Sequence, residues 1–235
     1  MRSGQNRQTK PLECCALWRG GSCRDATYRK VETIGVKAPL KIQGGHFATS
    51  HAHTNYYIDL TTIKARANEA QDIASALVRM YLFSTVVDTI VCMEGTEVIG
   101  AFLSEELTKG GYLNTNAHKT IYVVRPEFNS NSQIIFRDNI KPMIAGKHVM
   151  ILMGSVITGK ALNKAMESVQ YYGGTITGIS AVFSVLDELN GVRISSVYGL
   201  KDVPDYAYYD YHGCEMCKRG EKIDALVNAY GISVL

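Results

Sequence analysis

The chain has 235 residues, of which 46% are hydrophobic and 20% are charged, and its formal net charge is +3. This composition excludes collagen-like, coiled-coil and intrinsically disordered chains, and the length suffices for a core without metal or disulfide staples. No apolar run approaches the roughly 20 residues that a membrane-spanning helix needs.

The N-terminal segment differs from the rest of the chain. Residues 1–45 contain nine Lys and Arg but only three Asp and Glu, so the remainder is mildly acidic. Residues 1–26 are rich in Gly, Arg, Cys and Ser and show no apolar period, which predicts a disordered leader. The first ten residues lack the apolar region of a signal peptide, and the few cysteines are clustered, so we expect a cytoplasmic protein with reduced thiols. Because no aromatic platform or basic helix accompanies the charge, we expect neither nucleic acid nor membrane as a partner.

Beyond the leader, apolar patterns alternate between strand and helix. In chain order they predict a weak strand over 28–36, a helix over 65–83, a strand over 88–93, a helix over 96–109, a strand over 119–124, a loop over 128–139, a strand over 147–153, a helix over 159–172, and strands over 175–186 and 192–198. This order is typical of an α/β fold whose parallel sheet carries helices on both faces. Ligands of such sheets bind at the carboxyl ends of the strands.

Two strand-to-helix loops fit that position, over residues 94–97 and 154–160. In the second loop, the apolar strand HVMILM runs into GSVITGKA and then into a helix. Amides at a helix N-terminus have no intrahelical partner and carry partial positive charge, so they favour a bound phosphate. Thr158 adds a hydroxyl donor and Lys160 a cation.

Residues 154–160 also satisfy the nucleotide-binding pattern G-x-x-x-x-G-K. That pattern continues with a Ser or Thr that ligates Mg²⁺, whereas the next residue here is Ala161. A P-loop nucleotide-binding protein therefore remains an alternative.

A longer resemblance covers about residues 28–235. The stretch VMILMGSVITGKAL resembles the phosphoribosyl-diphosphate motif of type I phosphoribosyltransferases. GGHFATSHAHTNYYIDL and DTIVCMEGTEVIGAFLSEEL resemble the N-terminal segment and the diphosphate loop of the orotate branch. YYGGTITGISAVFSV and the closing YHGCEMCKRG follow in the same order.

The resemblance implies a phosphoribosyltransferase-like domain over residues 27–235 with a small N-terminal hood. It implies a homodimer that binds a phosphoribosylated ligand or nucleotide, with Mg²⁺ as a cofactor. By the same resemblance, the 5′-phosphate is held by Ser155, Thr158, Gly159 and Lys160, and the diphosphate side is lined by Glu94, Gly95 and Thr96.

Several positions depart from the family pattern. Met153 and Gly154 stand where the motif has two acids, and Ile157 replaces its first Thr. Residues 125–138 offer Arg125 and Arg137 but no lysine, and residues 180–191 contain no basic group for a carboxylate such as that of orotate. The resemblance favours a transferase of the orotate type, whereas the missing acids favour a non-catalytic regulatory module that binds the same ligands.

The remaining candidates are His and Cys clusters. His46, His51 and His53 with Asp59 do not have the spacing of a zinc site, and the resemblance assigns their segment to the cover of the cleft. Cys214 and Cys217, with His212 nearby, form half of a zinc knuckle, which needs a second pair from Cys14, Cys15 or Cys23. We therefore assign no metal to the site. The tyrosines between residues 206 and 211 are expected to pack rather than to stack on a base.

Overall fold

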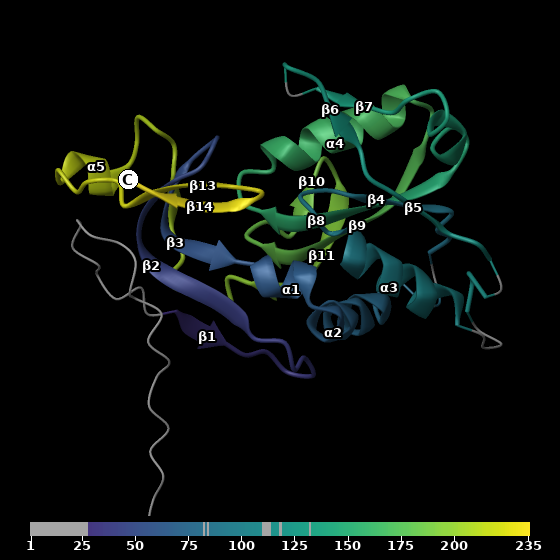
Figure 1. Ribbon diagram of the computed structural model, residues 1–235, viewed down its shortest axis with the longest axis horizontal. Coiled ribbons are helices and arrows are strands. Elements are labelled where there is room, and N and C mark those ends of the chain that lie inside the picture. The colour runs from purple at the N-terminus through teal and green to yellow at the C-terminus, as the bar shows by residue number, and fades with distance from the viewer. Residues whose placement is uncertain (1–27, 82, 84, 110–113, 118, 132) are drawn as a thin grey trace, which may run out of the picture.

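The computed structural model describes residues 28–235 apart from 82, 84, 110–113, 118 and 132. The leader predicted over residues 1–26 lies outside the described residues. The described residues form two six-stranded sheets and a two-stranded one: one six-stranded sheet is the centre of an α/β body, and the other forms a hood at one end of it (Figure 1).

The body is built on a six-stranded sheet of order β10-β11-β9-β8-β4-β5. All neighbouring strands are parallel except β10, which pairs antiparallel with β11. The bounds are β4 Thr89–Cys92, β5 Tyr122–Val124, β8 His148–Val156, β9 Thr175–Ser184, β10 Glu188–Leu189 and β11 Val192–Gly199. The predicted α/β class with a parallel sheet is confirmed.

Helices cover both faces of this sheet, with α1, α2 and α3 on one side and α4 on the other (Figure 1). Their bounds are α1 Thr61–Ala65, α2 Ala67–Val78, α3 Glu97–Thr108 and α4 Lys160–Tyr171. Successive strand residues alternate between the two cores: Ile90 and Cys92 pack with α2 and α3, whereas Val91 packs with α4. Among the described helices, none has both the length and the apolar character needed to cross a bilayer.

The hood sheet combines the two ends of the described chain. Its order is β12-β3-β2-β13-β14, and β1 also pairs with β2. The strands are β1 Arg29–Val31, β2 Leu40–Ala48, β3 His53–Asp59, β12 Tyr208–Tyr209, β13 Ala225–Asn228 and β14 Gly231–Val234. The resemblance implied an N-terminal hood, and the structure adds to it a C-terminal hairpin whose Ala225 pairs with Phe47.

Several local features differ from the predictions. The predicted helix over 65–83 is α2, which spans only Ala67–Val78, and the unpredicted α1 precedes it across the extended Arg66. The predicted loop over 128–139 contains a small hairpin, β6 Glu127–Phe128 and β7 Ile134–Ile135. Strand β8 continues to Val156, three residues beyond its predicted end, because β9 keeps pairing with it. Two short helices, η1 Lys141–Met143 and α5 Glu215–Lys218, complete the described elements.

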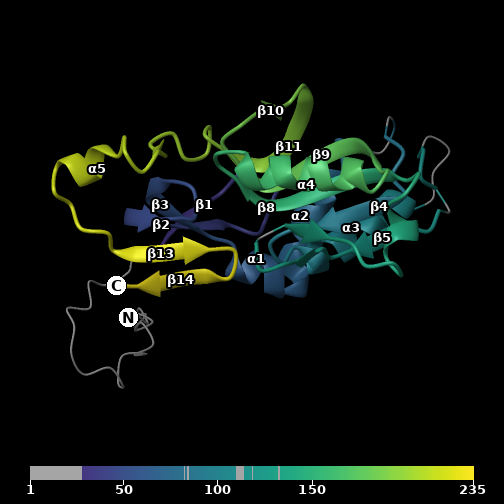
Figure 2. The same cartoon turned by 90° about the horizontal axis from the view of Figure 1, so that it is seen from above.

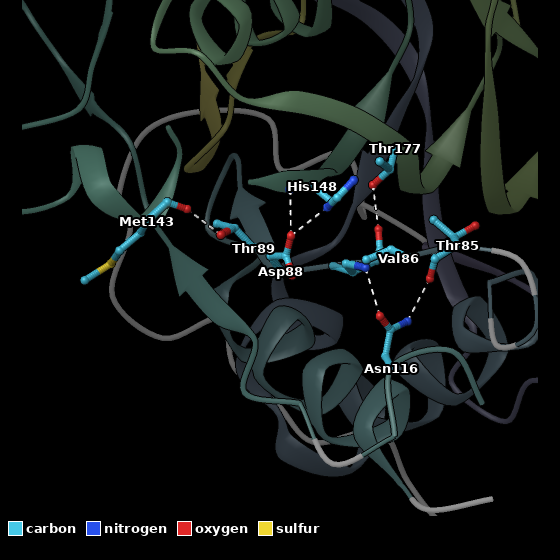
Figure 3. A network of polar contacts seen from close by, with 9 residues as sticks. Thr85, Val86, Asp88, Thr89, Asn116, Met143, His148 and Thr177 are labelled. Carbon is cyan, nitrogen blue, oxygen red and sulfur yellow. Dashed lines mark hydrogen bonds and ion pairs between the residues drawn. The ribbon is translucent and has the colours of Figure 1, made fainter. Parts of the chain in front are cut away.

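A polar network braces the amino ends of the core strands (Figure 3). The buried Asn116 accepts a hydrogen bond from the amide of Val87 at 2.9 Å and donates one to the carbonyl of Thr85 at 2.8 Å. Asp88 accepts from both the amide and the ring of His148, at 2.9 and 2.8 Å. These polar side chains join strands and loops to each other, and the hydrogen bonds of Asn116 satisfy its buried amide.

Candidate functional site

A cavity of about 360 Å³ lies where the carboxyl ends of β4 and β8 meet the hood sheet. This is the expected place for a ligand in a parallel sheet, and the volume is within the range of small-molecule sites. The hood contributes residues 49–51 and the hairpin turn at residues 228–231. The body contributes Lys64 from α1, the β4–α3 turn, and the end of β8 with the bend that follows it.

The bend between β8 and α4 comprises Ile157, Thr158 and Gly159. Gly159 has a positive φ of 75° and is the N-terminal cap of α4, without a side-chain hydrogen bond to the first turn. The first helical bond of α4 runs from the amide of Asn163 to the carbonyl of Gly159. The earlier amides of the helix are therefore outside its hydrogen-bond ladder. The Thr158 hydroxyl accepts only a long 3.5 Å contact from the amide of Lys160, so both remain suited to an oxyanion.

The same geometry argues against the P-loop alternative. Gly154 and Ser155 are part of β8, and Ser155 pairs with Phe183 of β9. A phosphate-wrapping loop over the whole G-x-x-x-x-G-K pattern is therefore not formed, because only three residues separate β8 from α4.

Lys64 and Glu94 meet beside Gly154. A Cβ on Gly154 would lie 2.9 Å from the Lys64 ammonium nitrogen and 2.9 Å from the Glu94 carboxylate. The same Glu94 oxygen accepts the amide of Ser155 at 3.1 Å. Glu94 itself has a φ of 58°, which turns the chain after β4 so that this side chain reaches the end of β8. The two charged side chains thus occupy the space next to a position where the related motif has an acid.

Burial and neighbouring charges shift the pKa values of three residues that line the cavity, Glu94, Lys64 and His51. Burial raises the pKa of Glu94, and the amide of Ser155 and the Lys64 ammonium oppose that shift. Burial lowers the pKa of Lys64, with Glu94 opposing. On the hood side, burial lowers the pKa of His51, and the positive charges of Lys160 and Lys164 lower it further. Two lysine charges from α4 therefore act on His51, which lines the hood side of the cavity.

The structure separates the predicted site residues into two groups. Five of them line the cavity: Ser155, Thr158, Gly159, Glu94 and Gly95. Lys160 is exposed and does not line it, although its charge reaches His51. Thr96 is fully buried, and its hydroxyl donates to the carbonyls of Met93 and Leu152. Thr96 thus fixes the β4–α3 turn and does not face the cavity.

The two arginines after β5 are held in ion pairs away from the cavity wall. Arg125 contacts Glu97 at 3.3 Å, and Arg137 contacts Glu127 at 2.5 Å. The Arg137 pair ties β6 to the residues after β7.

Several cavity residues were not predicted from the sequence. Lys64 belongs to α1, which lies before the helix predicted from residue 65, and the turn at residues 228–231 comes from the C-terminal hairpin. Tyr206, expected to pack, is buried against Phe183 with ring centroids 5.3 Å apart, and it also lines the cavity. Tyr211 donates its hydroxyl to the carbonyl of Thr49 at 2.8 Å, which supports the loop over the cavity.

Comparison with known proteins supports the resemblance. No protein-family model matches the chain. The chain is 26% identical to orotate phosphoribosyltransferase of Chlorobaculum parvum over 198 residues, which are 83% of this chain and 93% of that protein. Among solved structures, orotate phosphoribosyltransferase of Mycobacterium tuberculosis H37Rv in complex with Fe(III) dicitrate has a TM-score of 0.48 and 18% identity, covering 70% of this chain and 92% of that chain. UMP synthase of Leishmania donovani has a TM-score of 0.48 and 21% identity, covering 68% and 34%. The sequence similarity confirms that the chain resembles orotate phosphoribosyltransferase.

Proposed function

We propose that this phosphoribosyltransferase-like chain binds a phosphoribosylated ligand in the cavity between the body and the hood. The observation that carries the proposal is the bend at Thr158 and Gly159, which lines the cavity and leads into the amides of α4 that lie outside its hydrogen-bond ladder. The 5′-phosphate of the ligand is assigned to this bend. The similarity to orotate phosphoribosyltransferase supports the assignment of the sugar phosphate.

The rest of the ligand then extends along the end of β8. Glu94, Gly95 and Lys64 line the side assigned to a diphosphate, where the Lys64 ammonium supplies positive charge. Mg²⁺ carried by the diphosphate would meet the carboxylate of Glu94, an oxygen ligand that this ion prefers. His51 of the hood and Tyr206, which precedes β12, also line the cavity.

The reaction proposed for this site is transfer of phosphoribose from phosphoribosyl diphosphate to a nucleobase. The bond from the sugar C1 to the diphosphate oxygen breaks, and a bond from C1 to a base nitrogen forms. Diphosphate leaves with the bonding electrons, and the base loses its proton to solvent. Orotate is a poor fit as the base, because residues 180–191 contain no basic side chain to meet its carboxylate.

A second function, a non-catalytic module that binds phosphoribosyl ligands, is favoured by one observation. Met153 and Gly154 replace the acids of the motif, and Lys64 and Glu94 occupy the space beside Gly154. No side-chain carboxylate at those two positions is available for the ribose hydroxyls or their metal.

Calorimetric titration separates the two functions. Phosphoribosyl diphosphate, ribose 5-phosphate and nucleoside monophosphates would be titrated with and without Mg²⁺, and turnover would be assayed with each nucleobase. Mg²⁺-dependent binding with turnover of a base identifies a transferase, whereas Mg²⁺-independent binding without turnover identifies the module. Failure of every sugar phosphate to bind contradicts both.

The proposal also includes a homodimer in the cytoplasm. Light scattering of the purified protein tests the dimer, and fractionation of cells tests the location. Neither outcome alters the assignment of the phosphate to the bend.

A further inference from the structure

Four metal-binding side chains from three segments meet in the hood. His46 lies on β2, His53 lies on β3, Cys214 is the N-terminal cap of α5, and Cys217 lies within α5. One ligand atom from each lies within 4.8 Å of all the others. The sequence alone left the histidines and the cysteine pair as separate clusters, and the structure brings two of the three histidines to the cysteine pair. His51, His212 and Asp59 are not part of this group.

The distances match the edges of a tetrahedral metal site. With Zn–N bonds of about 2.0–2.1 Å and Zn–S bonds of about 2.3 Å, tetrahedral geometry places two nitrogens about 3.4 Å apart and a nitrogen and a sulfur about 3.6 Å apart. The His46 Nε2 to His53 Nδ1 distance is 3.1 Å. The Cys214 and Cys217 sulfurs lie 3.5 and 3.6 Å from His46 Nε2, and Cys217 lies 3.2 Å from His53 Nδ1.

A β-bulge and a nearby glycine position His46. The pairing of β2 with β3 shifts register between Gly44 and Phe47, and such a bulge re-aims a side chain, here that of His46. Gly45 makes this close approach to the C-terminal segment feasible, because a Cβ there would lie 2.9 Å from the Asp224 carboxylate. Asp224 in turn accepts the amide of His46 at 2.9 Å.

The cysteines sit on a compact turn that brings both sulfurs to one side. The amide of Lys218 donates to the carbonyl of Cys214, and the amide of Gly220 donates to the carbonyl of Cys217. Gly220 has a φ of 76°, a conformation that favours glycine and reverses the chain after the second cysteine. The Cys-x-x-Cys spacing on such a turn is the usual half of a structural zinc site.

The outer nitrogen of His46 is held as in known metal centres. His46 Nδ1 lies 3.1 Å from the carbonyl of Glu221, to which it donates. In the neutral ring this leaves the lone pair of Nε2 directed at the cluster, which is the form that binds a metal. Zn²⁺ with two thiolates and two neutral imidazoles has no net charge, which suits a group of which three members are buried.

We propose that His46, His53, Cys214 and Cys217 bind a structural Zn²⁺ ion. All four tetrahedral positions are filled by protein, so the ion has no open position for a substrate. Its role is to fasten the C-terminal segment to β2 and β3 at the outer end of the molecule, where Figure 1 shows α5.

The proposed ion site is also connected along the chain to two segments that line the cavity. His46 and His53 bracket the loop whose residues 49–51 line the cavity, and Cys217 leads into the β13–β14 hairpin whose turn lines it as well. Figure 2 shows this hairpin running from the α5 side toward α1. Loss of the ion is therefore expected to loosen both segments and, on the proposed function, to weaken sugar-phosphate binding.

Metal analysis of the full-length protein, purified without chelators from zinc-supplemented cells, tests the site. The expected result is about one zinc per chain, lost in Cys217→Ser and in His53→Ala. His212→Ala, an exposed histidine two residues before Cys214, is the matched control and keeps the ion. A variant in which Cys14, Cys15 and Cys23 are all serine should also keep it, because the four proposed ligands lie elsewhere in the chain.

Cobalt substitution keeps the test independent of variants that fail to fold. Unaltered protein refolded with Co²⁺ should show the intense visible absorption of a tetrahedral site together with thiolate-to-cobalt charge transfer. Weak octahedral absorption, a protein that retains no zinc, or zinc lost with the three leader cysteines but kept by Cys217→Ser would each overturn the proposal. These readouts do not involve a phosphate ligand, so they fail or succeed separately from the proposed function.

Discussion

Lys64 and Glu94 approach each other across Gly154, each with a charged atom 2.9 Å from the place where a Cβ on Gly154 would stand. The pair explains how the chain tolerates glycine at this point of the ligand site. The carboxylate that the related motif carries on β8 is absent, and a carboxylate from the β4–α3 turn lies beside the vacant position instead. The carboxylate is thus supplied by Glu94 after β4 and not by a residue of β8, and the Lys64 ammonium lies near it.

Introducing an acid at Gly154 should therefore conflict with Glu94. We expect Gly154→Asp to unfold more readily than Gly154→Ala by about 1–3 kcal/mol at neutral pH, because two carboxylates then compete for one buried ammonium. The difference should shrink at acidic pH, as the carboxylates become protonated. Urea unfolding at both pH values measures it, with Gly44→Asp against Gly44→Ala as the exposed control. Equal stability of the two Gly154 variants at neutral pH would show that the space is open.

His51 should report the binding of an anion. Burial and the charges of Lys160 and Lys164 lower its pKa, and a bound anion would oppose those charges and raise it. Protonation of His51 should accordingly favour binding, so that affinity for sulfate, which stays ionised, rises as the pH falls. NMR titration of the ring with and without sulfate measures the shift, and Lys160→Ala should raise the pKa in the free protein.

The ring of His212, which does not line the cavity, is the control resonance for that titration. If neither sulfate nor Lys160→Ala changes the pKa of His51, this histidine is not near the anion site.

The α/β body was predictable because its signals are local. β4 and β8 are short apolar runs, and each is followed within a few residues by the start of an amphipathic helix. The end of β8 was misplaced because Gly154 and Ser155 look like loop residues. They remain in the strand since β9 continues to pair with it as far as Ser184. A neighbouring strand here outweighs local propensity.

The C-terminal half of the hood was not predictable, because its contacts join distant parts of the chain. The pairing of Ala225 with Phe47 has no counterpart in the spacing of either segment. For the same reason, the sequence analysis expected a second cysteine pair beside Cys214 and Cys217. In the structure, their neighbours are histidines from β2 and β3. Lys64 was missed because the short helix α1 was not predicted, since the expected helix began at residue 65.

The stability of the fold should depend on Asp88 at low pH. Burial raises the pKa of Asp88, but its bonds from the amide and ring of His148 and the charge of Lys119 outweigh burial and leave it lowered. A lowered folded-state pKa stabilises the protein above the unfolded pKa of about 3.9, and that contribution is lost as the pH falls through the folded value. Urea unfolding between pH 6 and 3 should show this loss in the wild type and less of it in Asp88→Asn.

Asp187→Asn, which removes an exposed carboxylate, is the matched control for that series. If Asp88→Asn follows the wild-type pH profile throughout, the contact between Asp88 and His148 does not contribute to stability.

Removing the Thr158 hydroxyl should weaken phosphate binding. We expect Thr158→Val to reduce the affinity for ribose 5-phosphate by about 1–2 kcal/mol, which is about 5–30-fold, because one donor to the phosphate is lost. Thr175→Val, at the exposed start of β9, should leave the affinity unchanged. Calorimetry measures both variants, and identical affinities for the two would remove Thr158 from the site.

The bend after β8 is tested most directly by a crystal structure of the protein with ribose 5-phosphate. We predict phosphate oxygens within hydrogen-bond distance of the amides of residues 160–162 and of the Thr158 hydroxyl. A structure in which the sugar phosphate binds elsewhere, with those amides bonded to the protein's own groups, would contradict the assignment.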